Sequence, residues 1–184
     1  MKKNHCCVTL LFFAFIAIFS SSYGQSNKNP EPSAPANHVV KGYFSFIIPW
    51  VTLSKEGTTT EFEKYTNIGF PVGINIYYNQ RFGISYEITP LVQWYKSEGS
   101  APFSKTNNLL FDPGIIFRGN HGFNFVPRLA FETQGRYGFT PVFNKVYLQT
   151  KDVDYWFSIS FPTRFGNNAP ASVGGNLQVG FTFN

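Results

Sequence analysis

Apolar residues alternate with small or polar residues through eight segments of the chain, polar connections separate these segments, and charged residues are scarce. Together these observations predict an all-β fold, an eight-stranded antiparallel up-and-down transmembrane β-barrel. Period-2 alternation gives each strand one apolar face and one small or polar face. Charged residues make up 14% of the chain and aromatic residues 19%, whereas about a quarter of the residues in a soluble domain are charged. This composition favours a protein whose outer surface faces lipid.

The first residues have the features of an export signal. Two lysines precede an apolar run at residues 8–19, and small residues lead to a cleavage site near Gly24. The run is too short to span a bilayer as a permanent helix, so residues 1–24 are predicted to be a signal peptide that is removed on export. Both cysteines lie in this segment, and its removal leaves the mature chain without a thiol or a disulfide.

Residues 25–38 are polar, rich in proline and without periodicity, which predicts a disordered periplasmic leader. Residues 39–184 are the predicted outer-membrane barrel domain. Loss of Lys2 and Lys3 leaves 13 of the 15 basic residues against 10 acidic ones, a net charge of +3. Because these charges are few and scattered, the sequence predicts no nucleic-acid partner. With no further apolar helix to span a bilayer, a membrane protein of this sequence requires a closed barrel.

Long polar connections and short turns alternate between the predicted strands. The strands are predicted at 39–50, 68–78, 82–94, 109–117, 123–131, 141–149, 155–161 and 176–183. Short turns fall at 79–81, 119–122 and 151–152, and the longest connections are 52–66 and 96–106. In the sixth strand the phase stays open, because Val142 and Phe143 compete for the apolar face. Outer-membrane barrels have an even number of strands, short periplasmic turns and longer outer loops, and this order agrees with that arrangement.

Aromatic residues gather at the two ends of the apolar faces, while the middle is richer in aliphatic residues. Such a layout is typical of aromatic girdles at the two membrane interfaces. The predicted girdle residues are Trp50, Tyr78, Phe82, Trp94, Phe117, Phe123 and Phe183. No charged residue interrupts the apolar face of the clear strands, where one charge at the bilayer midplane would cost about 2–4 kcal/mol. Outer-membrane lipid is therefore the predicted partner of this face.

Prolines within the predicted strands argue against the membrane barrel, because each one removes a hydrogen-bond donor from the strand ladder. Six fall within predicted strands: Pro49, Pro71, Pro90, Pro113, Pro127 and Pro162. A soluble eight-stranded barrel would also show period-2 alternation. The alternative to the membrane barrel is a soluble periplasmic lipocalin-like binder, whose apolar face would line a cavity for an apolar ligand.

The last predicted strand carries a recognisable pattern. Residues 176–183 read Asn-Leu-Gln-Val-Gly-Phe-Thr-Phe, followed by Asn184. This end is similar to the C-terminal signal of the small outer-membrane β-barrel proteins of Gram-negative bacteria, of the OmpX, OmpW and OmpA-barrel kind. The resemblance extends over residues 39–184. It implies insertion in the outer membrane, a periplasmic C-terminus, and recognition of the last strand by the barrel-assembly machinery.

Charged side chains are predicted to meet inside the barrel. An eight-stranded barrel is just wide enough for its own side chains to fill it. Glu87, Asp112 and Arg128 lie at similar distances from the short turns, and we predict an ion-pair network centred on Arg128. The predicted network also includes Arg118, nearer the turn, and Glu132. Such a network would plug the interior or line a path for a small solute.

Catalytic and metal-binding patterns are missing from the sequence. His38 falls in the leader and His121 in a tight turn, and neither is in register with a nearby serine. With no cysteine left after cleavage, no metal-ligand motif remains. The sequence therefore predicts a protein that is not an enzyme and has no cofactor. Its expected role is structural, adhesive or surface-interactive, with at most restricted passage of small solutes, and no extracellular partner is indicated.

Overall fold

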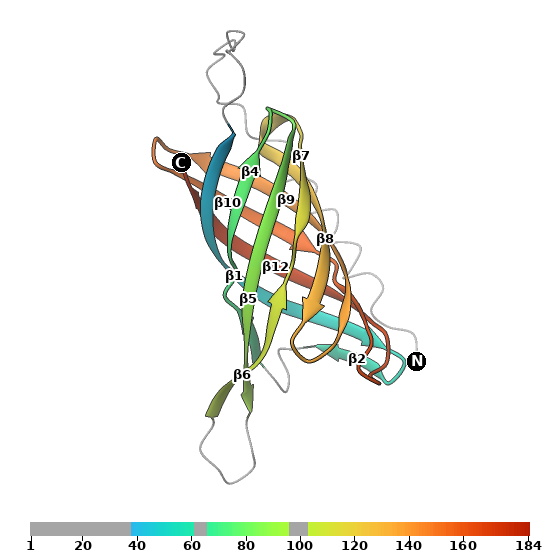
Figure 1. Cartoon of the computed structure of the whole chain (residues 1–184). Helices are drawn as coiled ribbons and strands as arrows, with labels where there is room; N and C mark the ends of the chain where they lie inside the picture. Colours follow the sequence, from blue (N-terminus) through green and yellow to red (C-terminus); the bar gives the residue numbers. More distant parts are fainter. Residues whose placement is uncertain (1–37, 61–65, 96–102) are drawn as a thin grey trace, which may run out of the picture. The chain divides into compact units, whose positions relative to one another are not determined.

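The computed structural model describes residues 38–60, 66–95 and 103–184, and for Thr59, Thr66, 93–95 and 103–107 only the backbone. The predicted signal peptide and nearly all of the predicted leader lie outside this range. Twelve strands of the described residues form one antiparallel sheet (Figure 1). They are β1 (Val39–Ser54), β2 (Gly57–Thr60), β3 (Thr66–Gly69), β4 (Val72–Tyr77), β5 (Phe82–Tyr95), β6 (Phe103–Phe111), β7 (Gly114–Arg118), β8 (Phe123–Glu132), β9 (Tyr137–Gln149), β10 (Val153–Ser160), β11 (Thr163–Phe165) and β12 (Ser172–Phe183).

The sheet closes on itself because β1 pairs with β12, from Tyr43 opposite Thr182 to Ser54 opposite Ser172. Three pairs of short strands, β3 with β4, β6 with β7 and β10 with β11, each make up one strand of the wall. The order around the wall is β1, β3/β4, β5, β6/β7, β8, β9, β10/β11 and β12. The predicted eight-stranded antiparallel up-and-down barrel is confirmed. No helix of the described residues is long and apolar enough to cross a membrane.

Three of the six prolines expected within strands lie at breaks in the wall strands, whereas Pro49, Pro90 and Pro127 lie inside β1, β5 and β8. Pro71, Pro113 and Pro162 each lie between the two short strands of a pair. Their carbonyl groups still accept hydrogen bonds from the neighbouring strand, at 2.9, 2.8 and 2.8 Å respectively. Because the missing N–H groups coincide with these breaks, the ladder resumes on both sides of each proline. Pro127 and Pro141 lie opposite each other in β8 and β9.

Two predicted connections are shorter than expected, because strands extend into them. β1 continues to Ser54 and forms a hairpin with β2, in which Val51 lies opposite Thr60. β6 begins at Phe103, inside the predicted connection 96–106. The residues of both extensions are mostly polar, so the period-2 pattern of a half-buried strand is weak there.

β9 resolves the phase that the sequence left open. Val142 is buried, whereas Phe143 is 54% exposed on the outer surface. Tyr147 and Leu148 are consecutive residues and both are exposed, because the register with β10 shifts beside them. This irregularity places residues of both parities on the outer face, which explains the ambiguous pattern.

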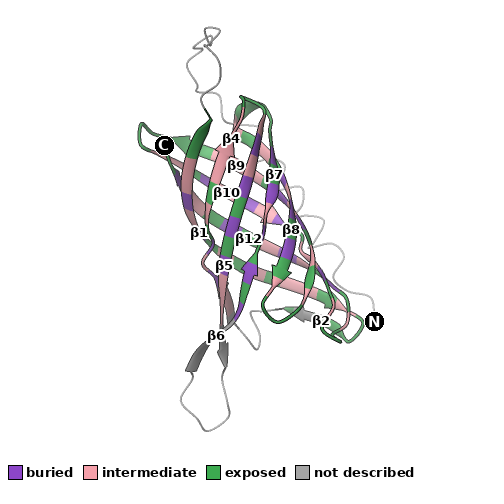
Figure 2. Ribbon diagram, viewed as in Figure 1, coloured by how far each residue is buried: buried purple, intermediate pink, exposed green. Residues whose placement is uncertain are grey.

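Buried and exposed residues alternate along the wall strands (Figure 2). The inward positions carry small and polar residues, including the fully buried Ser45, Ser85 and Ser158. The outward positions carry large apolar residues, such as Leu129, which is 57% exposed. The barrel is therefore apolar outside and polar inside, the reverse of a soluble domain.

Candidate functional site: the barrel lumen

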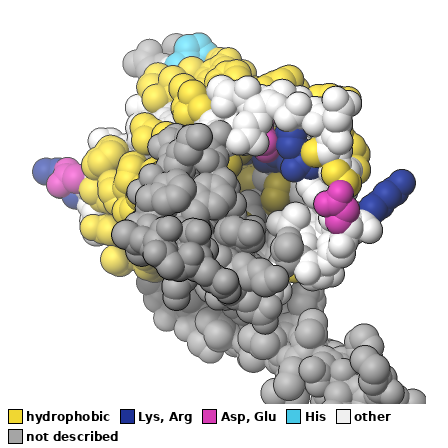
Figure 3. Space-filling view, turned by 90° about the horizontal axis from the view of Figure 1, so that it is seen from below, with side chains coloured by type: hydrophobic (Ala, Val, Ile, Leu, Met, Phe, Trp, Pro, Cys, Tyr) yellow, Lys and Arg dark blue, Asp and Glu magenta, His cyan; other side chains and the backbone are white. Residues whose placement is uncertain are grey.

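Two cavities occupy the lumen, one toward each end of the barrel. The loop-side cavity has a volume of about 260 Å³ and is lined by residues such as Asp112, Glu132 and Arg136. The turn-side cavity, of about 210 Å³, is lined by Lys41, Arg118 and other polar residues. Figure 3, seen from the loop end, shows a hollow with basic and acidic side chains inside it.

A charged cluster, here called the waist, lies between the two cavities. Arg128 Nη1 of β8 lies 2.7 Å from Glu87 Oε2 of β5. Tyr43 of β1 donates its hydroxyl hydrogen to the same oxygen at 2.8 Å. Arg128 Nη2 donates to the Tyr43 hydroxyl at 3.2 Å and to Ser85 Oγ at 3.3 Å. Because β1 and β8 are four positions apart in a ring of eight, this cluster crosses the whole lumen.

The remaining cross-section at this level is filled from β1, β10 and β12. Gln178 Nε2 donates to Ser45 Oγ at 2.8 Å, and Ser158 Oγ donates to Gln178 Oε1 at 3.1 Å. Arg128, Val142 and Gln178 line both cavities and therefore form the partition between them. Toward the turns, Val142 packs with the buried side chains of Ile116 and Val126.

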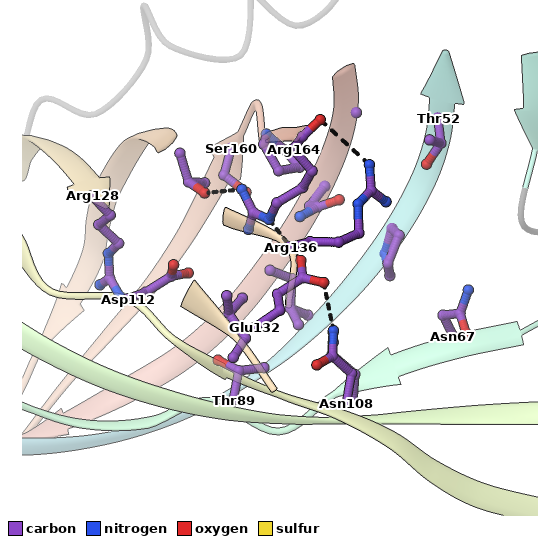
Figure 4. A pocket seen from close by; sticks show the side chains of 18 of the residues that line it. Thr52, Asn67, Thr89, Asn108, Asp112, Arg128, Glu132, Arg136, Ser160 and Arg164 are labelled. Atoms are coloured by element: carbon purple, nitrogen blue, oxygen red, sulfur yellow. Dashed lines mark hydrogen bonds and ion pairs between the residues drawn. The ribbon is translucent and has the colours of Figure 1, made fainter. Parts of the chain in front are cut away.

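A second charged cluster lies in the loop-side cavity (Figure 4). Arg164 Nε lies 2.8 Å from Glu132 Oε1, and Arg164 Nη1 donates to Thr140 Oγ1 at 2.9 Å. Asn108 Nδ2 donates to the other oxygen of Glu132 at 2.6 Å. Arg136, in the connection between β8 and β9, donates to Ser172 Oγ at 3.0 Å.

The predicted interior residues are divided among these clusters. Glu87 lies with Arg128 in the waist, whereas the partner of Glu132 is Arg164. Asp112 lines the loop-side cavity and forms no ion pair within 4 Å with any described residue. Arg118 lies apart from both clusters, with its guanidinium 4.9 Å above the centre of the Tyr77 ring.

Tyr43 and Arg164 are not among the predicted site residues. Tyr43 occupies an inward position of the first predicted strand, and Arg164 lies three residues beyond the end of the seventh, with the inward parity of that strand. Tyr43 was hard to recognise because an aromatic residue in a strand suggests the apolar face, and its hydroxyl is the part that binds. Arg164 follows Pro162, beyond the end of the predicted strand, although the inward parity of Ser158 and Ser160 continues to Arg164. At both positions the sequence places a side chain with a polar end inside the barrel, and this was the feature that could have identified them as site residues.

The predicted girdle residues lie on the outer surface wherever their side chains are described. Trp50, Phe117, Phe123 and Phe183 are 42 to 51% exposed. Tyr78 and Phe82 are half-buried against each other, with ring centres 6.3 Å apart. The row continues across neighbouring strands from Phe82 to Phe117 at 5.9 Å, then to Phe125 and Phe143. The side chain of Trp94 lies outside the described residues.

Gly73 is required by the position of Tyr43. A Cβ atom at Gly73 would overlap the Tyr43 phenol ring and the Tyr86 carbonyl oxygen, whereas one at Gly42 would have no other heavy atom nearer than 4.0 Å. We expect Gly73→Ala to displace Tyr43 from the waist and to lower the free energy of unfolding by about 1–3 kcal/mol. Urea unfolding followed by tryptophan fluorescence measures this, with Gly42→Ala as the control expected to change it by less than about 0.5 kcal/mol. Equal effects of the two substitutions would contradict the argument.

The described residues contain no group of three or more His, Cys, Asp or Glu side chains that could hold a metal ion. His121 has a left-handed backbone (φ 56°) in the turn after β7, and its carbonyl accepts a hydrogen bond from Lys145.

Comparison with solved structures agrees with the fold. Neisserial surface protein A (NspA) is 12% identical, with a TM-score of 0.55 over 80% of this chain and 99% of that chain. Ail, the attachment invasion locus protein of Yersinia pestis, is 9% identical, with a TM-score of 0.50 over 78% of this chain and 96% of that chain. No model of a known protein family matches the sequence, and no curated protein sequence matches it significantly. The chain has the fold of the small outer-membrane β-barrels.

Proposed function

We propose that this chain is an integral outer-membrane β-barrel whose lumen is closed and whose role is exercised at the cell surface. Residues 1–24 direct export, and residues 25–38 remain as a periplasmic leader. The wall then contacts lipid, and the last strand is the part recognised by the barrel-assembly machinery. The longer connections, 52–66 and 96–106, extend outside the cell, where they are available for adhesion or other surface contacts.

The waist is the observation that carries the closed lumen. Its ion pair and hydrogen bonds join β1, β5 and β8, and the two cavities lie on either side of it. Glu87 and Arg128 are both buried, so separating them would leave two unpaired charges away from water. Because breaking a buried pair is strongly unfavourable, the closed state is the stable one. A path for solutes would require the waist to open.

The outer surface supports contact with lipid. Large apolar side chains cover it, for example Val40, which is 60% exposed, and Leu129, which is 57% exposed. The outward-facing Lys145 places its ammonium group 4.2 Å from the centre of the Phe123 ring and donates to the His121 carbonyl, beside a turn. A lysine that reaches toward the interface in this way is compatible with a bilayer. The lipocalin-like alternative requires the apolar face to line a cavity, whereas most of the large apolar side chains of the described residues are exposed on the outer surface.

A surface role is favoured over conduction because the lumen is divided into two cavities, of about 260 and 210 Å³. NspA is named as a surface protein and Ail as an attachment invasion locus protein. Those names describe the two proteins and give this chain a reason to be tested for adhesion. Fractionation is the first test: the protein should appear in the outer membrane as a heat-modifiable band, and recovery as a detergent-free soluble periplasmic protein would overturn the proposal.

Conductance in planar bilayers tests the closed lumen. We expect the wild-type barrel to be silent and the Glu87→Ala/Arg128→Ala variant to conduct small ions, because Arg128 is part of the partition between the cavities. The double substitution avoids leaving one buried charge without a partner. Lys41→Ala is a suitable control, since Lys41 lines only the turn-side cavity and lies outside the waist. Regular channels in the wild-type protein would contradict a closed lumen.

A further inference from the structure

The loop-side cavity contains a carboxylate that the clusters of the lumen do not use. Asp112 is only 3% exposed, and its Oδ1 atom has no hydrogen-bond partner among the described residues. Figure 4 shows this side chain between Arg128 and Glu132, pointing into the cavity. A buried carboxylate oxygen without a partner is costly, because it has given up its hydration. Its position calls for a ligand that supplies a donor or a positive charge.

The other two carboxylates of the cavity already have partners on both oxygens. Glu87 is held by Arg128 and Tyr43 on one oxygen and by Thr89 on the other. Glu132 is held by Arg164 on one oxygen and by Asn108 on the other. Arg128 and Arg164 are thus each paired with another carboxylate, although the buried Nε atom of Arg128 has no hydrogen-bond partner among the described residues, and Asp112 is the carboxylate without an ion pair.

Positive charge is not supplied from the mouth of the cavity. Arg136 comes from the connection between β8 and β9, and its Nη2 atom donates to Ser172 Oγ at 3.0 Å and to the Pro170 carbonyl at 3.1 Å. Among the described residues, Arg136 forms no ion pair with Asp112. The cavity as a whole is lined by three carboxylates and three guanidinium groups, but the hydrogen bonds of Arg136 go to neutral oxygen atoms, so Asp112 has no guanidinium paired with it.

The remaining lining indicates the kind of cation. Ser160 is 1% exposed, lines the same cavity, and has an Oγ atom without a partner among the described residues. Ile47, Leu91 and Leu110 give the cavity an apolar wall. A divalent metal ion would need several more anionic ligands than Asp112 offers. A primary ammonium group carries three donors and one charge, and the apolar wall suits a short chain of methylene groups.

We propose that the loop-side cavity binds a small organic ligand through its primary ammonium group, with Asp112 as the counter-ion. Ser160 provides a second hydrogen-bonding group for the ligand, and the aliphatic side chains contact its methylene groups. The volume of about 260 Å³ admits a small amine but not a polymer. This inference requires only the cavity, so it stands or falls independently of where the barrel is located and of whether its lumen conducts.

The test uses the full barrel purified in detergent, with n-butylammonium chloride as the probe. Isothermal titration should give saturable binding at one site, and sodium butyrate of the same chain length should not bind. Asp112→Asn, which keeps the shape and removes the charge, should weaken n-butylammonium binding at least about tenfold. Asp154→Asn is the matched control, since Asp154 pairs with Lys41 in the turn-side cavity, and its affinity should be unchanged.

Three results would overturn the proposal: no saturable n-butylammonium binding to the wild-type barrel, equal affinity in the Asp112→Asn variant, or tighter binding of butyrate. The heat-modifiable migration of each variant shows whether it has folded. If the Asp112→Asn variant fails to fold, the wild-type comparison of the two probes decides the question alone. Ser160→Ala removes one unpartnered atom and is expected to weaken binding a few-fold.

Discussion

Replacing Glu87 alone with leucine is expected to lower the free energy of unfolding by about 3–5 kcal/mol, because Arg128 is left buried without its anion. Arg128→Met alone should cost a similar amount, since it leaves Glu87 buried and unpaired. The two charged atoms lie 2.7 Å apart, and neither side chain has enough exposure to be rehydrated in place. Unfolding by urea in lipid vesicles, followed by tryptophan fluorescence, measures the change.

The double variant Glu87→Leu/Arg128→Met is the control for this prediction. Replacing a buried ion pair by apolar residues of similar volume is often neutral or stabilising. We therefore expect the double variant to be more stable than either single variant, which gives a coupling energy in a double-mutant cycle. Additive losses in the two single variants would mean that the pair does not act as a unit.

A charge on the outer wall is expected to have the second large effect. Leu129 is 57% exposed, lies next to Arg128 in sequence, and is opposite Phe139 in β9, so it faces outward at the level of the waist. Leu129→Arg should lower the free energy of unfolding from lipid vesicles by about 2–4 kcal/mol, the cost of an arginine near the bilayer midplane.

The control for Leu129→Arg is the same kind of substitution near the membrane interface. Val40 is 60% exposed and lies near the start of β1, opposite Ile76, at the turn end of the barrel. Val40→Arg should cost only about 0–1 kcal/mol, since charges near the interface remain hydrated. Equal costs at Leu129 and Val40 would contradict the proposed position of the lipid belt.

The faces of the strands were readable from the sequence, whereas contacts across the lumen were only partly so. Alternation assigns Leu129 to the outside and Arg128 to the inside without any knowledge of the register. Pairing of Glu132 with Arg164 depends on how far neighbouring strands are staggered, and the shear of a barrel is a property of the closed ring. Counting residues from the turns brings Glu87 close to the level of Arg128 because the pairing of β7 with β5 and β8 has no register shift between the turns and Gly114.

Pro113 is a second feature whose structural setting could not be predicted from the sequence. From the sequence, Pro113 is expected to disrupt one strand, because proline has no backbone N–H to donate. In the structure Pro113 separates β6 from β7, and its carbonyl accepts from Leu129 N at 2.8 Å. Sequence alone does not show that one wall strand can consist of two short strands in succession. The place of the Trp94 side chain in the girdle and the partner contacts of the outer connections stay predictions.

The waist also has a mechanical consequence. A ring of eight strands joined only by its own ladder can flatten, since each hydrogen-bonded pair is free to flex about its neighbour. Tyr43 and Arg128 join opposite walls through a 3.2 Å hydrogen bond, and Glu87 connects both to a third strand. These contacts therefore resist flattening of the barrel at the level of the waist.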